Sequence, residues 1–415
     1  MEYLREFADH NAYDIAKSSL SLPNVAHCIQ EGDVHYNPLI NWADEYLTFI
    51  ALGNGTFTFT PQNNNVISYS IDNGENWTEG NSVSVANGDK VMWKGTMTPT
   101  SSGIGKFSST GSFDVKGNVM SLLFGDDFKN KTDLTGKAYA FYRLFYNATY
   151  LVSPKDLSLP ATTLADYCYS NMFRGCISMT TSPELPATTL ATYCYNYMFN
   201  SCRSLTTAPE LPATTLADHC YYSMFYGCTN LTSAPELPAT ILAESCYYYM
   251  FNGCTSLTTA PELPATILAN NCYSSMFYNC SNLTTAHELP ATILANNCYS
   301  SMFYNCSNLT TAPELPATTL ANNCYNGMFN GCTSLTTAPE LPATRLVEGC
   351  YQDMFQGCTD LNYIKAMFTT TPSTTYTRSW VRNVSSRGTF VKNSSATWDV
   401  TGMNGIPTGW TVQTA

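Results

Sequence analysis

Apolar and polar positions recur with a period of 26 residues between about residues 138 and 365. In the first full unit, residues 160–185, the apolar positions are one, three or four residues apart, which is typical of one face of a helix. These positions are Ala165, Cys168, Tyr169, Met172, Phe173 and Cys176. Residues 179–185 predict a short extended segment, because threonine favours strands and Pro183 cannot continue a helix. Each unit therefore predicts a strand, a turn and a helix of about three turns.

A period of this length is typical of a solenoid, in which stacked units share one core. Stacking places like residues above one another, as in a Phe column from Phe173 to Phe355 and a Leu column from Leu205 to Leu361. Strands stack about 4.8 Å apart, whereas packed helices need about 8–10 Å. The predicted fold class is therefore an α/β repeat, a curved solenoid with strands inside and helices outside.

Sixteen of the seventeen cysteines fall on this lattice, in two columns eight residues apart. On the predicted helix, eight residues span about 12 Å, beyond the roughly 7 Å that a disulfide allows between Cα atoms. Between helices of adjacent units the expected separation of about 8–10 Å is also too large. Residues 139–151 align with the first unit at an offset of 28 and place Ala140 and Ala148 at the cysteine positions. Because alanine replaces neither a bridge nor a metal ligand, we expect packing cysteines, no metal and no cofactor.

The flanking segments differ from the repeats. Residues 41–133 predict a small all-β, sandwich-like domain, in which residues 46–59 form a hairpin around Asn54 and Gly55. Further strands are expected at residues 66–71, 82–85, 90–94, 105–109 and 112–115. The predicted boundaries are an N-terminal arm or anchor at 1–40 with the off-lattice Cys28, a solenoid at 134–365 with a cap unit at 134–159, and a tryptophan-containing C-terminal cap at 366–415.

Composition narrows the possible functions. Only 12% of residues are charged, the net charge is −12 and the sequence pI is about 4.8, so the chain lacks the basic surface that nucleic-acid binding requires. The first residues show no apolar core behind a basic start, and no stretch of 18 apolar residues exists, so neither an export signal nor membrane insertion is expected. No catalytic triad spacing, phosphate loop or pair of catalytic carboxylates is visible, so an enzyme is not expected.

Two local motifs carry alternative interpretations. Residues 70–77, with Ser70, Asp72, Gly74 and Trp77, resemble the Asp-box hairpins of sialidases, in which the box is a structural turn. One copy without an arginine triad predicts a turn rather than sialidase activity. A glutamate column predicts either a solvated edge that discourages aggregation or a stripe that binds cations. It comprises Glu184, Glu210, Glu236, Glu262, Glu288, Glu314 and Glu340.

The repeat, written MFxGCxSLTTAPELP, resembles the BspA-like leucine-rich repeats, which implies a leucine-rich-repeat solenoid. The opening LPNVAHCIQEGDVHYNP, the β-rich segment and the closing GTFVKN and GIPTGWTV are similar to virion proteins of crAss-like gut bacteriophages. That similarity implies a fibre or appendage of a virion, attached to other virion proteins through the N-terminal arm and made in the host cytoplasm without an export signal. A homo-oligomer is compatible with this role, although no heptad run requires one.

Positions that vary between units are expected on the solvent face, where aromatic residues offer contact area at low entropic cost. The candidate binding residues are Tyr167, Tyr193, Tyr197, Tyr222, Tyr226, Tyr248, Tyr249, Tyr278 and Tyr304. The predicted function is non-enzymatic binding of host cell-surface glycan or protein by a phage virion protein. The alternatives are a secreted or surface-exposed bacterial adhesin of the same repeat family, located at the bacterial cell surface, and a structural decoration protein without a ligand.

Overall fold

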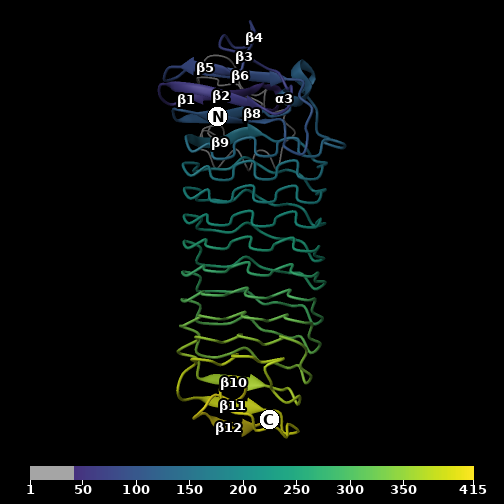
Figure 1. Ribbon diagram of the computed structural model, residues 1–415, viewed down its shortest axis with the longest axis vertical. Helices are drawn as coiled ribbons and strands as arrows, with labels where there is room; N and C mark the ends of the chain where they lie inside the picture. Colours follow the sequence, from purple (N-terminus) through teal and green to yellow (C-terminus); the bar gives the residue numbers. More distant parts are fainter. Residues whose placement is uncertain (1–41) are drawn as a thin grey trace, which may run out of the picture. The chain divides into compact units, whose positions relative to one another are not determined.

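The computed structural model describes residues 42–415, which form one compact unit, so the predicted arm at 1–40 and Cys28 lie outside the described residues. Within this unit a β-rich module is followed by a stack of similar chain turns (Figure 1). Strands and turns dominate, and α3 (Ser121–Phe124) is the one α-helix of the described part. Short 3₁₀ helices occur at η3 (Trp42–Asp44) and η4 (Gly125–Asp127).

The β-rich module contains two sheets whose inner faces meet. The six-stranded sheet has the order β4 (Thr78–Glu79), β3 (Ile67–Ser70), β6 (Lys90–Gly95), β1 (Leu47–Ala51), β8 (Phe113–Asn118) and β9 (Leu151–Ser158). The three-stranded sheet has the order β5 (Ser82–Val85), β2 (Gly55–Pro61) and β7 (Gly105–Ser109). Phe49 of β1 joins the two sheets, because its ring lies 5.3 Å from Phe57 of β2 and 4.7 Å from Phe107 of β7.

The predicted hairpin around Asn54 and Gly55 is wrong, although both of its strands exist. Strand β1 pairs with β6 and β8, whereas β2 pairs with β5 and β7, so the turn carries the chain from one sheet to the other. The burial pattern gives the reason. Four of the five β1 residues are buried, as expected for a central strand, and Phe49 and Phe57 gain more by facing each other across the layer than by lying side by side.

The predicted helix in each unit is also wrong. In residues 167–176, Tyr169 N–H donates to Cys194 O of the next unit at 3.0 Å, whereas Ser170 N–H donates to Tyr167 O at 3.1 Å within a turn. The alternation continues along the segment, so half of the amide groups bond between units as in a parallel sheet. The left-handed backbone recurs every fourth residue, with φ of +58° at Tyr167, +57° at Asn171 and +78° at Gly175. The segment is therefore a ribbon of consecutive four-residue turns.

The sequence predicts a curved solenoid because helices pack farther apart than strands, but the repeats in the described part of the chain contain no such helices. Parallel bridges such as those between Thr163, Thr189 and Thr215 join residues 26 positions apart on another side of the stack. The turn ribbons are hydrogen-bonded to each other directly as well, so both sides advance by one sheet spacing per unit. The stack follows a straight column in the view of Figure 1. Because no helices widen one side, the spacing mismatch that would bend the column is absent.

The interior consists of columns of identical residues. Phenylalanine rings from Phe145 to Phe355 are 5.4–5.8 Å apart and nearly parallel, as the sequence predicts for the Phe column. A second, fully buried column of tyrosines runs from Tyr169 to Tyr351, with ring separations of 5.7–6.0 Å. Strand β9 continues this stack into the module, because it lies parallel to β8 and its Val152 O accepts Thr180 N–H.

The last residues close the other end of these columns. Trp380 is fully buried, with its ring 6.2 Å from Phe355, and its indole N–H donates to Gly405 O at 2.9 Å. Trp398 stacks on Phe368 at 5.2 Å. A parallel three-stranded sheet of β10 (Tyr363–Ala366), β11 (Thr389–Lys392) and β12 (Thr411–Thr414) continues the stack. The apolar columns therefore end against tryptophan rings rather than against water.

Candidate binding face

The turn ribbons form one continuous surface, which we call the turn face. In each four-residue turn two residues belong to the core, such as Met172 and Phe173, and the next two, such as Arg174 and Gly175, belong to the outer side, where some positions are covered by their neighbours. The nine predicted tyrosines all occupy outer positions of these turns. Eight of them are half-buried and only Tyr226, at 40% exposure, is counted as exposed, because neighbouring rings cover one another.

The residues equivalent to Tyr167 in successive units form a column on the turn face, which we call the first outer column. Aromatic rings stack on one another along part of it. Tyr139 and Tyr167 are 4.6 Å apart with rings 4° from parallel, and Tyr167 and Tyr193 are 4.7 Å apart at 9°. His219 continues the stack, 4.4 Å from Tyr193 at 22°. The sequence prediction included Tyr167 and Tyr193 but missed Tyr139 and His219, which occupy the same column at offsets of 28 and 26 residues.

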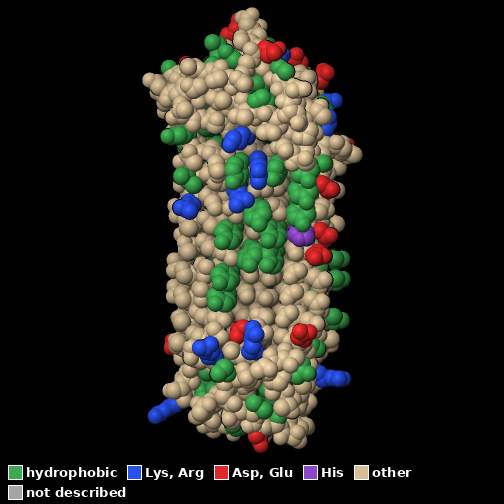
Figure 2. All heavy atoms as spheres, in the orientation of Figure 1, with side chains coloured by type: hydrophobic (Ala, Val, Ile, Leu, Met, Phe, Trp, Pro, Cys, Tyr) green, Lys and Arg blue, Asp and Glu red, His purple; other side chains and the backbone are tan. Residues whose placement is uncertain are grey.

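A second cluster and a separate pair hold the other predicted tyrosines. Tyr197, Tyr222 and Tyr248 follow one another with ring separations of 5.3 and 5.1 Å. Tyr249 packs edge-on against Tyr248 at 4.2 Å and against Tyr226 at 6.3 Å. The remaining two, Tyr278 and Tyr304, stack on each other at 4.5 Å. Because His219 also lies 5.8 Å from Tyr222, the first stack and the second cluster are in contact, whereas no ring contact joins the pair to them. Figure 2 shows hydrophobic side chains, tyrosine included, gathered along one side of the column.

Burial sets the protonation state of these phenols. It raises the pKa of Tyr222 and Tyr248 well above the ordinary value, and it raises that of Tyr167, with a further contribution from Tyr193. These three phenols are therefore neutral and able to donate hydrogen bonds throughout the physiological range.

A shallow groove of about 380 Å³ opens at the end of the turn face nearest the β-rich module, a size at the lower limit of small-molecule pockets. Arg143 and Arg174 lie among its aromatic residues, and neither was predicted from the sequence. In Figure 2, Lys and Arg side chains interleave with aromatic ones in this part of the face. The lining residues are Ser101, Tyr139, Tyr142, Arg143, Tyr167, Ser170, Asn171, Arg174, Tyr193, Asn196 and Tyr197.

The Asp-box segment is a stabilised turn, as predicted. Ser70 Oγ donates to Asp72 Oδ1 at 2.6 Å and accepts Gly74 N–H at 2.9 Å. The hydrogen bond from Ser70, with two more from Asn76, lowers the pKa of Asp72 to about 2. The turn places Trp77 beneath the ammonium group of Lys94, 4.2 Å from the ring centre.

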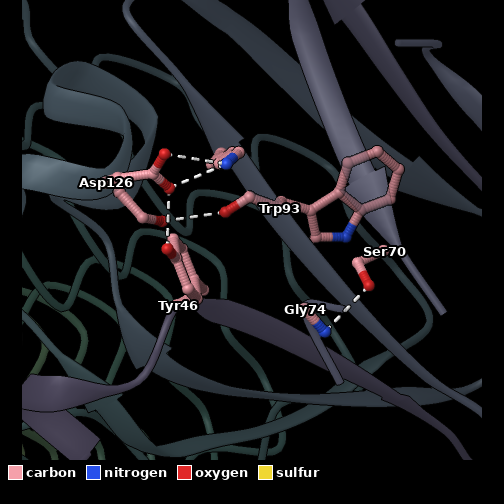
Figure 3. A network of polar contacts seen from close by, with 7 residues as sticks. Tyr46, Ser70, Gly74, Trp93 and Asp126 are labelled. Carbon is pink, nitrogen blue, oxygen red and sulfur yellow. Dashed lines mark hydrogen bonds and ion pairs between the residues drawn. The ribbon is translucent and has the colours of Figure 1, made fainter. Parts of the chain in front are cut away.

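A neighbouring polar network secures the same sheet. Lys94 forms an ion pair with Asp126 at 2.7 Å, and Tyr46 Oη donates to the same carboxylate at 2.7 Å (Figure 3). Burial, followed by the interaction with Asp126, raises the pKa of Tyr46 to about 12. These residues bond to one another and to the backbone, so the network supports the sheet rather than forming a reactive site.

The lattice cysteines are buried and free, but the geometric reason given by the sequence is wrong. The unit spacing is that of a sheet, so cysteines of one column lie closer together than the helical prediction allowed. In the second column, from Cys176 to Cys358, each Sγ donates to a phenylalanine carbonyl at 3.0–3.2 Å. Burial raises the pKa of the thiols, to about 12 for Cys194 and Cys228.

Other chemistry is sparse in the described part of the chain. Residues 42–415 contain no cluster of three or more His, Cys, Asp or Glu side chains arranged to hold a metal ion. None of the described helices has the length and apolarity needed to cross a bilayer. The seven glutamates of the predicted column are all exposed, and Glu340 forms an ion pair with Lys365 at 2.9 Å.

Comparison with known proteins places the repeats in a described class. A family model described as "BspA type Leucine rich repeat region" matches six copies over residues 139–284 and 245–379, which together cover more than half of the chain. No curated protein sequence matches the chain. A solved structure titled "Crystal structure of TLR13-ssRNA13 complex" is 12% identical with a TM-score of 0.25, and the alignment covers 64% of this chain and 42% of that one.

Proposed function

Because the chain belongs to the BspA-type leucine-rich repeat family, we propose that it is a non-enzymatic binding protein whose turn face recognises glycans on a host cell surface. Repeat proteins of this class typically bind ligands rather than catalyse reactions. The observation that carries the proposal is the row of stacked rings at the first outer column, at separations of 4.4–4.7 Å. A protein ligand on the same surface is the second candidate.

Stacking orders these rings before a ligand binds. Each ring of the row is held by its neighbours, so little side-chain entropy remains to be lost when a ligand arrives. A ladder of rings offers apolar surface to the C–H groups of sugar rings, and the phenol hydroxyl groups of the half-buried tyrosines offer hydrogen bonds to sugar hydroxyl groups. The low charge content of the chain favours such a neutral, polar ligand over nucleic acid.

In this proposal the protein is a fibre or appendage of a bacteriophage virion. Its support is the similarity of the opening, β-rich and closing segments to virion proteins of crAss-like phages. Residues 1–40 would attach the chain to other virion proteins, the β-rich segment at 41–133 would connect to the solenoid, and residues 366–415 would close it. Such a protein would be assembled into the virion in the host cytoplasm and would leave the cell by lysis.

Binding is tested with the full chain on an array of bacterial surface glycans. We expect saturable binding that Tyr193→Ala and Tyr197→Ala each weaken about tenfold, in line with the loss of one stacked aromatic contact. Thr258→Ala, an exposed residue outside the turn face, serves as the matched control and should leave binding unchanged. Binding to no glycan, or equal loss with the Thr258 variant, would contradict the glycan-binding role.

The virion location is tested separately. Mass spectrometry of purified particles from the source should detect the chain at a fixed copy number per particle. Its absence from particles together with its presence on bacterial envelopes would favour the adhesin alternative. Presence on particles without any ligand binding would favour the structural decoration protein.

A further inference from the structure

Cationic and aromatic side chains alternate along the groove at the end of the turn face. The guanidinium carbon of Arg143 lies 4.9 Å from the ring centre of Tyr142 and 5.1 Å from that of Tyr146. That of Arg174 lies 6.0 Å from Tyr146 and 4.9 Å from Tyr197. Each guanidinium is therefore held against one or two rings, a geometry worth about 0.5–1 kcal/mol at an exposed site.

The positive charge of these two arginines is not neutralised within the described chain. Among residues 42–415 neither has a carboxylate within ion-pair distance, whereas Lys94, Lys365 and Lys392 each have one. Arg174 donates only to a neutral acceptor, Asn171 Oδ1, at 3.2 Å. The nearby Asp166 carboxylate accepts Thr192 N–H at 3.1 Å instead. In a chain with a net charge of −12, this end of the face is a local site of uncompensated positive charge.

We propose that this groove binds a carboxylate-bearing sugar, such as a uronic or sialic acid residue, within the glycan that the turn face recognises. The inference rests on the proposed glycan-binding function and adds the chemical class of one sugar. A guanidinium held against a ring can still present N–H groups, of which Arg174 uses one for Asn171, and such a fork matches the two oxygens of a carboxylate. The aromatic rings beside it take the sugar ring, and the phenol hydroxyl groups of the lining tyrosines bond to its hydroxyl groups.

Different parts of the turn face are expected to bind neutral and acidic sugars. Farther along, beyond Tyr197, the rings of Tyr222, Tyr248 and Tyr249 have no arginine among their contacts, and this part suits neutral sugars. Because both arginines line the groove, only the groove is expected to prefer a carboxylate-bearing sugar. Removing their charge is therefore expected to lower the affinity for acidic sugars much more than the affinity for neutral sugars.

The test compares a sugar acid with its own neutral form. The probes are tetragalacturonic acid and its fully methyl-esterified counterpart, with sialyllactose and lactose as a second pair, titrated into the full chain by calorimetry. We expect the acidic member of at least one pair to bind about tenfold or more tightly, as a charge-assisted bidentate contact predicts, and this advantage to shrink with added salt.

Variants assign the preference to the groove. Arg143→Gln and Arg174→Gln should each remove most of the advantage of the acid over the neutral form, and Arg174→Lys should restore part of it because charge returns without the planar fork. Arg203→Gln removes the same charge from an exposed residue outside the groove lining and should change nothing. Equal melting temperatures of the variants would show that the fold is intact.

The outcomes separate this inference from the function on which it depends. Equal affinity for acid and ester, with binding still sensitive to Tyr193→Ala, would overturn the acidic subsite and leave the glycan-binding function standing. Binding to none of the four probes, and to no glycan on the array, would overturn both. Retention of a host envelope fraction that survives periodate oxidation would identify a protein ligand and would overturn the sugar-acid assignment.

Discussion

Leu257 shows how much a single side chain contributes to this column. It is fully buried, and its counterparts Leu231 and Leu283 are buried in the units before and after it. Because equivalent residues in each unit follow the same backbone, a residue lost from one unit leaves a gap that its identical neighbours cannot fill without leaving their own positions. Packing in columns therefore makes each layer sensitive to the loss of volume.

We predict that Leu257→Ala lowers the free energy of unfolding by about 2–5 kcal/mol, the range for leucine truncation in rigid cores. Thr258→Ala is the matched control, because Thr258 is the adjacent residue and is exposed, and its effect should stay within about 0.5 kcal/mol. Urea unfolding followed by tyrosine fluorescence measures both. Equal effects of the two variants would contradict the column packing.

The buried thiols predict a loss of stability at alkaline pH. Burial raises the pKa of Cys194, Cys228 and Cys280 to about 12, whereas the unfolded chain has ordinary thiols near 9. Above pH 9 the unfolded state releases protons that the folded state retains, so the free energy of unfolding falls by roughly 1 kcal/mol per thiol per pH unit. Below pH 9 this contribution is constant.

With sixteen such thiols, we expect the urea midpoint to be flat between pH 7 and about 8.5 and to fall steeply from about pH 9. Cys194→Ala combined with Cys228→Ala should make the decline shallower. The same slope in that variant and in the parent chain would show that other groups, such as the buried tyrosines, control alkaline unfolding.

At the element scale, the sequence predicts strands better than it predicts the repeating unit. The observed β5 and β7 have the bounds expected from alternation and turn residues. The prediction of a helix is wrong because an apolar period of four over about twelve residues resembles the helical period of 3.6. A signal against the helix was available: the positions of Tyr167, Asn171 and Gly175 are filled in other units mostly by Asn, Ser, Gly or His. Asparagine and glycine tolerate a left-handed backbone well.

In the turn ribbon, a branched side chain at a left-handed position should lower the free energy of unfolding, whereas a helix has no such positions. Asn279 and Asn282 are both exposed, and each accepts a side-chain amide hydrogen bond from the asparagine 26 residues later, at 3.0 and 3.3 Å. They differ in backbone, because Asn279 has a φ of +59° and Asn282 is not left-handed. We predict that Asn279→Val costs about 1–2 kcal/mol more than Asn282→Val, the penalty for a left-handed residue with a Cβ branch.

Thermal unfolding of the two valine variants measures this difference. Asn279→Gly provides the rescue and should lie close to the parent chain, because glycine adopts positive φ freely while losing the same amide contact. Equal costs for the two valine variants would show that position 279 is not left-handed in solution.

At the scale of the whole molecule, the nine tyrosines predicted from the sequence lie on one face, and the sequence missed other residues of that face. The nine tyrosines lie at outer positions because both a helix and a turn ribbon with a period near four expose the same residues. Tyr139, Arg143 and Arg174 were missed because their role depends on the sheet-like spacing, which brings side chains of successive units into ring contact. A helical spacing of about 8–10 Å would have kept those rings apart.

A straight column of like-on-like units predicts that one whole unit can be removed. Residues 272–297 and 298–323 differ only at His287 against Pro313 and at Ile293 against Thr319. Deleting residues 298–323 joins Asn297 to Cys324. Asn297 is therefore still followed by a cysteine, as it is by Cys298 in the parent chain. Each apolar column then closes over the gap, as Phe277 meets Phe329 in place of Phe303.

We predict that this deletion variant folds cooperatively, with a smaller urea dependence of unfolding in proportion to the buried surface that one unit contributes. Its far-ultraviolet circular dichroism should match the parent and lack the double minimum of helix. Deleting residues 298–310, half a unit, is the control: it sets proline into the Phe column and threonine into the Cys columns, and it should abolish cooperative unfolding. If the two deletions destabilise the chain equally, the column does not depend on register, and the turn face cannot hold its rings in the rows that the binding proposal requires.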